Sequence, residues 1–339
     1  MINKIALAGC GNVGTALLEI LHEKRNILKN KYNFVFEVTM VTDIIKGTIA
    51  DPNGLDLGKI LEALHEKNSL KNFKQKEGTF DEILLYSNAT MLAEATPTNL
   101  KTGEPGLSFI RTALKNGISA TMTNKGPIAI AMNELMALAK ENDAQLKYEG
   151  VIMSGTPLIN MISSGMTGCD IIKAEGILNG TTNFILTEMS EGMNFDEALA
   201  TAQALGYAET DPTGDIEGWD PAVKIAILAK ILYGIDINVN DVEREGITHI
   251  TAEMIDKAKA EKSKIKLIAS IHRDCNGEIH AKVAPTKISR SHPLASVDGI
   301  TNAITLTSDN LGETTLIGAG AGRKETGQAL LTDLIAMAK

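Results

Sequence analysis

A glycine-rich turn between an apolar run and a helical pattern constrains this chain more than any other feature. Residues 5–8 are apolar, Gly9-Cys10-Gly11-Asn12-Val13-Gly14 follows directly, and residues 15–30 carry leucines at helical spacing. In this strand–turn–helix context, G-x-G-x-x-G is typical of dinucleotide binding, because its glycines allow a tight turn, close approach of a pyrophosphate and close helix–strand packing. The helix start then offers N–H groups to the phosphates. We therefore expect a dinucleotide site at Gly9, Gly11, Asn12, Val13 and Gly14; a glycine turn without a ligand is the alternative, which the surrounding pattern disfavours.

That pattern is an alternation of short apolar runs and helical segments through residue 148. Strands are expected at 5–8, 34–42, 91–95, 118–122 and 145–148, with helices between them, which indicates βαβ units and a parallel sheet. Beyond it lie an apolar helix at 221–233 and alternating strands at 264–272, 278–285, 303–307 and 314–317. We predict an α/β fold: an N-terminal Rossmann-type parallel-sheet domain over 1–148, to which 318–339 return, and an α+β domain over 149–317.

Composition and charge narrow the class of protein. Of the 339 residues, 44% are hydrophobic and 22% charged, which is ordinary for a globular protein. The formal charge of −9 disfavours a nucleic-acid partner, whose phosphates require a basic surface. There is no apolar run long enough for a membrane span, and the N-terminal apolar run is too short for a signal peptide.

The cysteines and histidines indicate a reducing compartment and no transition metal. Cys10, Cys169 and Cys275 are widely spaced, as reduced cysteines of cytoplasmic proteins are. The six histidines include no H-x-x-x-H pair, so a transition-metal site is not expected.

The end of the second expected strand bears on the choice of cofactor. Asp43 stands where an acidic residue binds the ribose hydroxyls of NAD, although it would also suit a solvated turn. Lys46 could instead meet a 2′-phosphate, so both NAD and NADP stay open. Because the Asp43 carboxylate would repel a 2′-phosphate, we expect NAD(H) to be used at least as well as NADP(H).

An acidic segment before the apolar helix is the first candidate for catalysis. Residues 206–220 contain five acidic side chains, and Asp220 and Lys224 lie at i, i+4 on one helix face. Burial in an apolar run can lower the pKa of a lysine, which suits proton transfer. An acidic helix start with one lysine that reaches solvent fits the same spacing.

Two further segments complete a candidate pocket for a zwitterion. Lys125 follows an expected parallel strand, at the sheet edge where ligands bind, or else is a surface lysine. Gly180-Thr181-Thr182 begins a helix and could receive a carboxylate, although threonine capping would explain it equally well. Acidic groups would hold an ammonium, the helix start a carboxylate, and the lysines the reacting oxygen.

The same segments resemble homoserine dehydrogenase, in the short form that lacks a regulatory ACT domain. The resemblance runs nearly end to end, through GCGNVG at 9–14, ATPTN at 95–99, TNKGPI at 123–128, GILNGTTNFILT at 176–187, AQALGYAETDP at 202–212 and GWDPAVK at 218–224. It implies the NAD(P)H-dependent reduction of L-aspartate 4-semialdehyde to L-homoserine, on the route to threonine, methionine and isoleucine. It also implies a homodimer whose 149–317 domain binds substrate, carries out catalysis and dimerises.

The resemblance assigns roles residue by residue. Catalysis would fall to Lys125, Asp220 and Lys224, and substrate binding to Gly180, Thr181, Tyr207, Glu209, Asp215, Asp220 and Lys224. Asp43, Thr96, Lys125, Gly320 and Gly322 would join the glycine turn in binding the cofactor. A monovalent cation, usually sodium, would bind Glu149 and the backbone carbonyls of Ile152, Ser154 and Thr156. Residues 151–155 and 323–327 depart from the usual family sequence, at the cation site and near the nicotinamide.

Two other functions remain to be separated from this one. An amino-acid dehydrogenase on a related scaffold would also bind the cofactor but would need ammonia. A nucleotide-binding regulator would keep the fold without turnover, which the Asp220/Lys224 pair disfavours. An acylating semialdehyde dehydrogenase needs a cysteine nucleophile, and none stands in a suitable segment.

Overall fold

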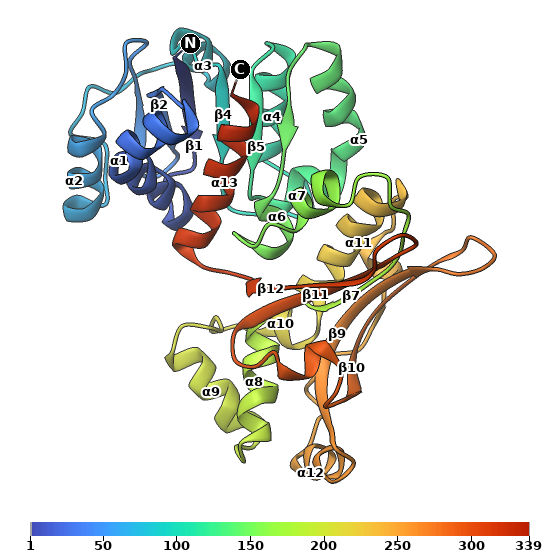
Figure 1. Cartoon of the computed structure of the whole chain (residues 1–339). Helices are drawn as coiled ribbons and strands as arrows, with labels where there is room; N and C mark the ends of the chain where they lie inside the picture. Colours follow the sequence, from blue (N-terminus) through green and yellow to red (C-terminus); the bar gives the residue numbers. More distant parts are fainter. Residues whose placement is uncertain (1, 339) are drawn as a thin grey trace. The chain divides into compact units, whose positions relative to one another are not determined.

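The computed structural model describes residues 2–338, which fold into two compact units. The first unit comprises the chain up to Ile159 and again from Gly322 onward, and the second comprises Asn160–Ala321. Figure 1 labels most of the helices and strands of both units. Among the described helices, none is long and apolar enough to cross a membrane.

The elements follow one another in a βα alternation first and in a mixed order afterwards. The first part of the chain forms β1 (Asn3–Ala8), α1 (Asn12–Tyr32), β2 (Phe36–Asp43), β3 (Gly47–Ala50), α2 (Leu57–Lys67), α3 (Phe80–Tyr86), β4 (Met91–Glu94), α4 (Gly106–Lys115), β5 (Ser119–Met122), α5 (Lys125–Glu141), β6 (Leu146–Lys147), α6 (Gly150–Met153) and α7 (Leu158–Asn160). The rest forms a π-helical turn (Met161–Gly165), β7 (Ile171–Ile177), α8 (Gly180–Ser190), α9 (Phe195–Ala204), α10 (Thr213–Ile216), α11 (Trp219–Tyr233), a 3-10 turn (Val239–Asp241), β8 (Glu243–Arg244), α12 (Ala252–Ala260), β9 (Ser263–Arg273), β10 (Ile279–Ser289), a second 3-10 turn (Pro293–Ser296), β11 (Thr301–Ser308), β12 (Gly312–Ala319) and α13 (Arg323–Met337).

The sheet of the first unit has the strand order β3-β2-β1-β4-β5-β6. From β2 to β6 neighbouring strands are parallel, and only β3 runs antiparallel to its neighbour β2. The order reverses between β1 and β4, which is where ligands bind in doubly wound sheets. The Rossmann-type prediction is confirmed, but the sequence analysis missed β3 and α3, which are too short to show a clear period.

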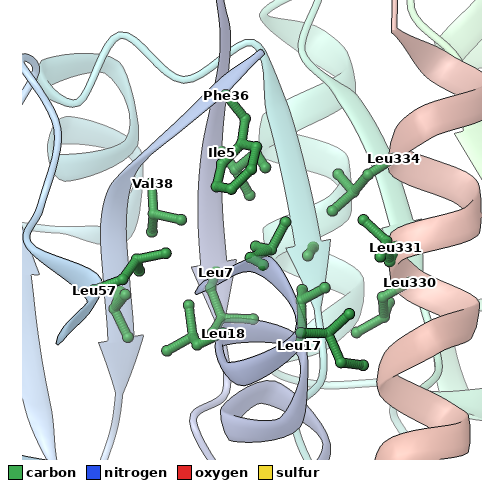
Figure 2. Packing of buried hydrophobic residues seen from close by; sticks show 14 of the residues in the cluster. Ile5, Leu7, Leu17, Leu18, Phe36, Val38, Leu57, Leu330, Leu331 and Leu334 are labelled. Atoms are coloured by element: carbon green, nitrogen blue, oxygen red, sulfur yellow. The ribbon is translucent and has the colours of Figure 1, made fainter. Parts of the chain in front are cut away.

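One hydrophobic core joins the first strands to the last helix. Leucines of α13 point toward β1, β4 and α1 in Figure 2, and each is at most 1% exposed. Their shared core includes Ile5, Leu7, Leu17, Leu18, Phe36, Val38, Leu57, Leu330, Leu331 and Leu334. The end of the chain is therefore part of the sheet unit.

Polar contacts extend this unit beyond residue 148, where the sequence analysis expected a boundary. The Glu149 N–H donates to Asp333 Oδ2 at 3.0 Å, and the hydroxyls of Ser154 and Thr326 lie 2.6 Å apart. Because Asp333 and Thr326 belong to α13, these bonds tie α6 to the last helix, and the unit ends at Ile159.

The second unit is built on a mostly antiparallel sheet in the order β12-β11-β7-β9-β10-β8. Strands β9 and β10 form a long hairpin from Ser263↔Ser289 to Arg273↔Ile279, and α8, α11 and α12 pack against β9. The acidic segment at 206–220 contains the short helix α10, and neither α10, α12 nor β8 was predicted. Helix α8 follows β7 after two residues, so it begins at the end of the sheet.

Candidate functional site

The three glycines of the turn after β1 have different surroundings. Gly9 has φ +88°, and a Cβ there would lie 2.5 Å from the Ala95 carbonyl. A Cβ on Gly14 would lie 2.0 Å from the Gly9 oxygen, whereas one on Gly11 would meet nothing within 4 Å. Gly9 and Gly14 are therefore required by packing, and Gly11 leaves open space at the start of α1. No side chain caps that helix start, so the turn fits a pyrophosphate.

Asp43, at the end of β2, is held by the backbone of two turns. Its Oδ2 accepts from the Cys10 N–H at 2.9 Å, and its Oδ1 accepts from the N–H groups of Ile45 and Lys46 at 2.9 and 3.0 Å. Burial raises the pKa of Asp43, but these three hydrogen bonds outweigh it and hold the pKa below its usual range. The Lys46 amine donates to the Cys10 carbonyl. A negative charge thus stands directly beside the glycine turn.

A pocket of about 960 Å³ lies beside this turn, within the first unit. Its walls include Gly9, Asp43, Ile44, Thr96 and Phe109. The Ile44 side chain is fully exposed, so it offers an apolar surface next to the Asp43 carboxylate. Carboxylate, apolar surface and open glycine turn together suit the ribose, base and phosphates of a dinucleotide.

Thr96 is held by a buried carboxyl group at the end of β4. Glu94 Oε1 accepts from the Thr96 N–H at 2.8 Å and from its hydroxyl, and the Asn124 amide donates to that hydroxyl at 3.3 Å. Burial raises the pKa of Glu94 to about 7, against these hydrogen bonds. Lys125 follows Asn124 as the first residue of α5, and its N–H donates to Thr98 at 3.4 Å. The structure thus places Thr96 and Lys125 on neighbouring segments.

The C-terminal glycines lie where the chain passes from the second unit to the first. Gly320 has no room for a side chain, because a Cβ there would lie 1.9 Å from Asn302 Cγ. Gly322 has φ +135° and is the N-cap of α13. Both positions require glycine, Gly320 by contact and Gly322 by backbone conformation.

The segment expected to bind a cation is a tight turn around a buried carboxylate. Glu149 is 2% exposed, and its Oε1 accepts from the Ile159 N–H at 2.8 Å. Ile152 belongs to α6, Ser154 turns the backbone with φ +52°, and Thr156 donates its N–H to the Met153 carbonyl. The structure therefore brings the four expected residues into one short loop.

In the second unit, Lys224 is the centre of a polar cluster. Its side chain lies on α11 and the residue is 5% exposed. Its Nζ lies 2.8 Å from Asp220 Oδ2, one turn earlier on the helix, and donates to the Leu178 carbonyl at 2.6 Å. Lys224 is therefore a buried, partnered amine, and the interpretation of a lysine that reaches solvent is wrong.

Asn179 connects this pair to a second carboxylate. As N-cap of α8, its Oδ1 accepts from the Thr182 N–H at 2.9 Å. Its Nδ2 donates to Asp215 Oδ1 at 2.7 Å and to Asp220 Oδ2 at 3.1 Å. Asn179 was not predicted as a site residue, because capping by the threonines also explains the start of this helix. An asparagine before Gly-Thr-Thr is the N-cap signal that points to it.

The other expected substrate residues differ in how close they come to this cluster. Burial raises the pKa of Asp215, against the hydrogen bond from Asn179, and the nearby charge of Asp220 raises it further. Thr181 donates its hydroxyl to the Tyr207 carbonyl at 2.6 Å, just after Gly180 at the start of α8. Glu209 lies on an exposed loop, where its carbonyl accepts from Gln203.

A dinucleotide-type glycine turn and a buried lysine–carboxylate cluster together define a nicotinamide-dependent oxidoreductase. Comparison with known proteins agrees. The sequence model of the homoserine dehydrogenase family matches residues 157–335. The chain is 42% identical to an NAD(+)-dependent homoserine dehydrogenase of Pseudomonas canavaninivorans, over 98% of this chain and 95% of that protein. It is 37% identical to a homoserine dehydrogenase of Methanocaldococcus jannaschii, over 98% and 97% of the two chains.

Solved structures show the same likeness. A putative homoserine dehydrogenase from Archaeoglobus fulgidus has a TM-score of 0.88 and 34% identity over 98% of both chains. A mutant of a hyperthermophilic archaeal homoserine dehydrogenase, in complex with NADPH, has a TM-score of 0.85 and 32% identity over 99% of this chain and 98% of the other. The chain belongs to the homoserine dehydrogenase family and is an NAD(P)-dependent oxidoreductase.

The glycine turn leads to a test that separates packing from binding. Gly11→Ala should leave the melting temperature close to that of the wild type, because a Cβ there meets nothing within 4 Å. It should weaken NADH binding, measured by fluorescence titration, because the methyl group fills the space at the helix start. Gly14→Ala is the comparison and should lower stability by about 1–3 kcal/mol through overpacking. Unchanged NADH affinity in Gly11→Ala would place the phosphates elsewhere.

Asp215→Asn should separate stability from substrate binding. Burial raises the pKa of Asp215, so the folded state holds this proton more tightly than the unfolded state, and the ionised group costs stability as pH rises through both pKa values. The neutral amide removes that cost and can still accept from Asn179, so the melting temperature at neutral pH should not fall. The KM for homoserine should rise by about tenfold or more if the Asp215 carboxylate binds the substrate ammonium, because a hydrogen bond between charged groups is worth about 1.5–3 kcal/mol. A lower melting temperature with unchanged KM would make Asp215 purely structural.

Proposed function

We propose that this chain reduces L-aspartate 4-semialdehyde to L-homoserine with NADH or NADPH, a step toward threonine, methionine and isoleucine. The observation that carries the proposal is the buried amine of Lys224, bonded to Asp220 and to the Leu178 carbonyl. Membership of the homoserine dehydrogenase family supports it.

In this proposal Lys224 is the general acid. A reduced nicotinamide dinucleotide, when bound, would supply the hydride for the aldehyde carbon. As negative charge develops on the carbonyl oxygen, the Lys224 ammonium stabilises it and donates a proton, which yields the alcohol. The Asp220 carboxylate orients that ammonium. Lys125, at the start of α5, is the second candidate for the same role.

The substrate is a zwitterion, and the second unit offers groups for both of its charges. The start of α8, at Gly180 and Thr181, suits the α-carboxylate. Asp215, Glu209 and Tyr207 suit the ammonium. Asn179 would act as a positioning residue, because it bonds to both the Asp215 and Asp220 carboxylates.

Replacement of Lys224 tests the central role. Lys224→Ala should lower turnover by about 10²-fold or more, because the general acid is lost. NADH affinity should barely change, because Lys224 belongs to the second unit and the glycine turn to the first. Asp220→Ala should weaken both turnover and substrate binding. The assay is oxidation of NADH and of NADPH with L-aspartate 4-semialdehyde, without ammonia, which also separates this activity from that of an amino-acid dehydrogenase.

Lys230 supplies a matched control. It lies on the same helix, is 8% exposed and pairs with Asp236. Lys230→Ala should therefore affect stability but leave turnover within a few-fold of the wild type. If Lys224→Ala stays folded and retains its turnover, the general acid is Lys125 or water instead.

For the cofactor, we propose contacts from the glycine turn, Asp43, Thr96, Lys125, Gly320 and Gly322. The Asp43 carboxylate beside the turn supports at least equal use of NAD(H), and the Pseudomonas relative is named NAD(+)-dependent. The similar archaeal homoserine dehydrogenase mutant is in complex with NADPH, so NADP(H) is also a candidate cofactor.

Asp43→Asn should shift cofactor preference toward NADP(H) by about tenfold, which corresponds to about 1.4 kcal/mol of removed repulsion. The ratio of kcat/KM values for the two cofactors measures the shift, and the unsubstituted protein should use NAD(H) at least as well as NADP(H). A wild-type preference for NADP(H) of about a hundredfold or more would contradict this proposal.

A sodium ion at Glu149 and the carbonyls of Ile152, Ser154 and Thr156 belongs to the same proposal, supported by the buried carboxylate in a tight loop. We also propose a cytoplasmic location, because Cys10, Cys169 and Cys275 are all free thiols.

For assembly we propose a homodimer formed through the sheet of the second unit. Strand β12 lies at the edge of that sheet, and its Ile317 side chain is 52% exposed. An edge with an exposed apolar side chain gains from pairing with a second copy. Sedimentation at micromolar concentration should give a dimer, and Ile317→Lys should shift it toward the monomer. A wild-type monomer would defeat the proposal.

A further inference from the structure

The far end of the β9–β10 hairpin gathers metal-binding side chains on one face. His272 on β9 is the direct cross-strand partner of His280 on β10. Asp274 follows the end of β9 and Glu278 precedes the start of β10, and their carboxylates lie near the His280 ring. The spacing rule that argued against a transition metal applies to residues on one helix and does not cover this cross-strand arrangement.

The distances match the needs of a small cation. One ligand atom from each of Asp274, Glu278 and His280 lies within 4.8 Å of the other two. Between His280 Nε2 and Asp274 Oδ2 the distance is 3.3 Å. Two ligand atoms that each lie about 2.1 Å from a tetrahedral Zn²⁺ are about 3.4 Å apart. The His272 ring stacks on that of His280 with centroids 4.9 Å apart, which brings a second imidazole to the cluster.

The carboxylate of Asp274 is already oriented by the turn. Its Oδ1 accepts from the N–H groups of Asn276 and Glu278, both at 2.9 Å. This leaves Oδ2 directed at His280. The side chains of His280 and Asp274 are 50% and 25% exposed, so an ion can enter from solvent without disturbing the core.

Neighbouring charges leave the cluster acidic. The neighbouring cations pair with carboxylates outside it: Lys173, the cross-strand partner of His272 on β7, with Glu175, Arg273 with Asp170, and Lys282 with Glu243. The negative charges of Asp274 and Glu278 can therefore balance the two positive charges of a divalent cation.

We propose that this hairpin end binds a divalent transition-metal ion such as Zn²⁺, through His280, Asp274, Glu278 and, after a rotation of its ring, His272. Imidazole nitrogens favour Zn²⁺, Co²⁺ or Ni²⁺ over Mg²⁺ and Ca²⁺, which require oxygen ligands. The ion takes the place of the hydrogen bond between His280 and Asp274 and cross-links β9 to β10. Its role is structural, because none of these residues belongs to the proposed catalytic cluster.

Calorimetric titration of the metal-free, full-length protein with ZnCl₂ tests this site. A Cys275→Ser background removes the exposed thiol as a competing ligand. We expect one ion per chain, a higher melting temperature with Zn²⁺, and unchanged turnover. His280→Ala should weaken Zn²⁺ binding by about tenfold or more, and Glu278→Gln should weaken it as well.

His249→Ala is the matched control. His249 also lies beside a carboxylate, with its Nε2 3.1 Å from Glu245 Oε1, but within residues 2–338 it belongs to no group of three potential metal ligands. Zn²⁺ binding should be unchanged in this variant. Three outcomes would overturn the proposal: no Zn²⁺ binding, equal binding by His280→Ala and the unsubstituted background, or Ca²⁺ binding as tight as that of Zn²⁺. None of them bears on homoserine oxidation, so the proposed function is tested separately.

Discussion

The burial of the Lys224 amine constrains how the second unit is arranged. Lys224 is 5% exposed, and an amine removed from water is costly unless polar partners replace the solvent. Its partners include the Leu178 carbonyl after β7 and the Asp220 carboxylate at the start of α11. The end of β7 and the first turn of α11 must therefore meet at one point. Because α8 begins two residues after Leu178, its N-terminus is placed beside the same amine.

Two carboxylates in this cluster share a single amide donor. Asp215 and Asp220 both accept from Asn179 Nδ2, and the Asp220 carboxylate also pairs with Lys224. The amide orientation is determined by its other end, because Oδ1 already accepts from the N–H of Thr182. Burial raises the pKa of Asp215 and the charge of Asp220 raises it further, although the hydrogen bond from Asn179 and the charge of Lys224 lower it. A cationic group of a substrate beside Asp215 would favour its ionised form, so the local electrostatics suit an ammonium.

Much of the fold could be predicted because it rests on local patterns. Alternating apolar runs and helical stripes indicated β1, β2, β4 and β5, and the i, i+4 spacing of Asp220 and Lys224 anticipated their ion pair. The burial of Lys224 could not be decided from spacing, since a lysine that reaches solvent has the same sequence pattern. Strand β3 was missed because four residues at a sheet edge show no clear period. The extension of the first unit to Ile159 depends on contacts with α13 that are remote in sequence.

The glycine turn shows why a motif and a site are different kinds of evidence. Gly9 and Gly14 are demanded by the folded chain itself, since a Cβ on either would collide with backbone atoms. A protein that had lost its ligand would still need both of them. Gly11 is different, because its surroundings are empty within 4 Å and its φ of −75° suits any residue. No packing constraint requires glycine at this position. Glycine is compatible with its place as the N-cap of α1, and the missing side chain leaves the backbone open to a ligand. The most informative residue of the motif is therefore the one that the fold does not require.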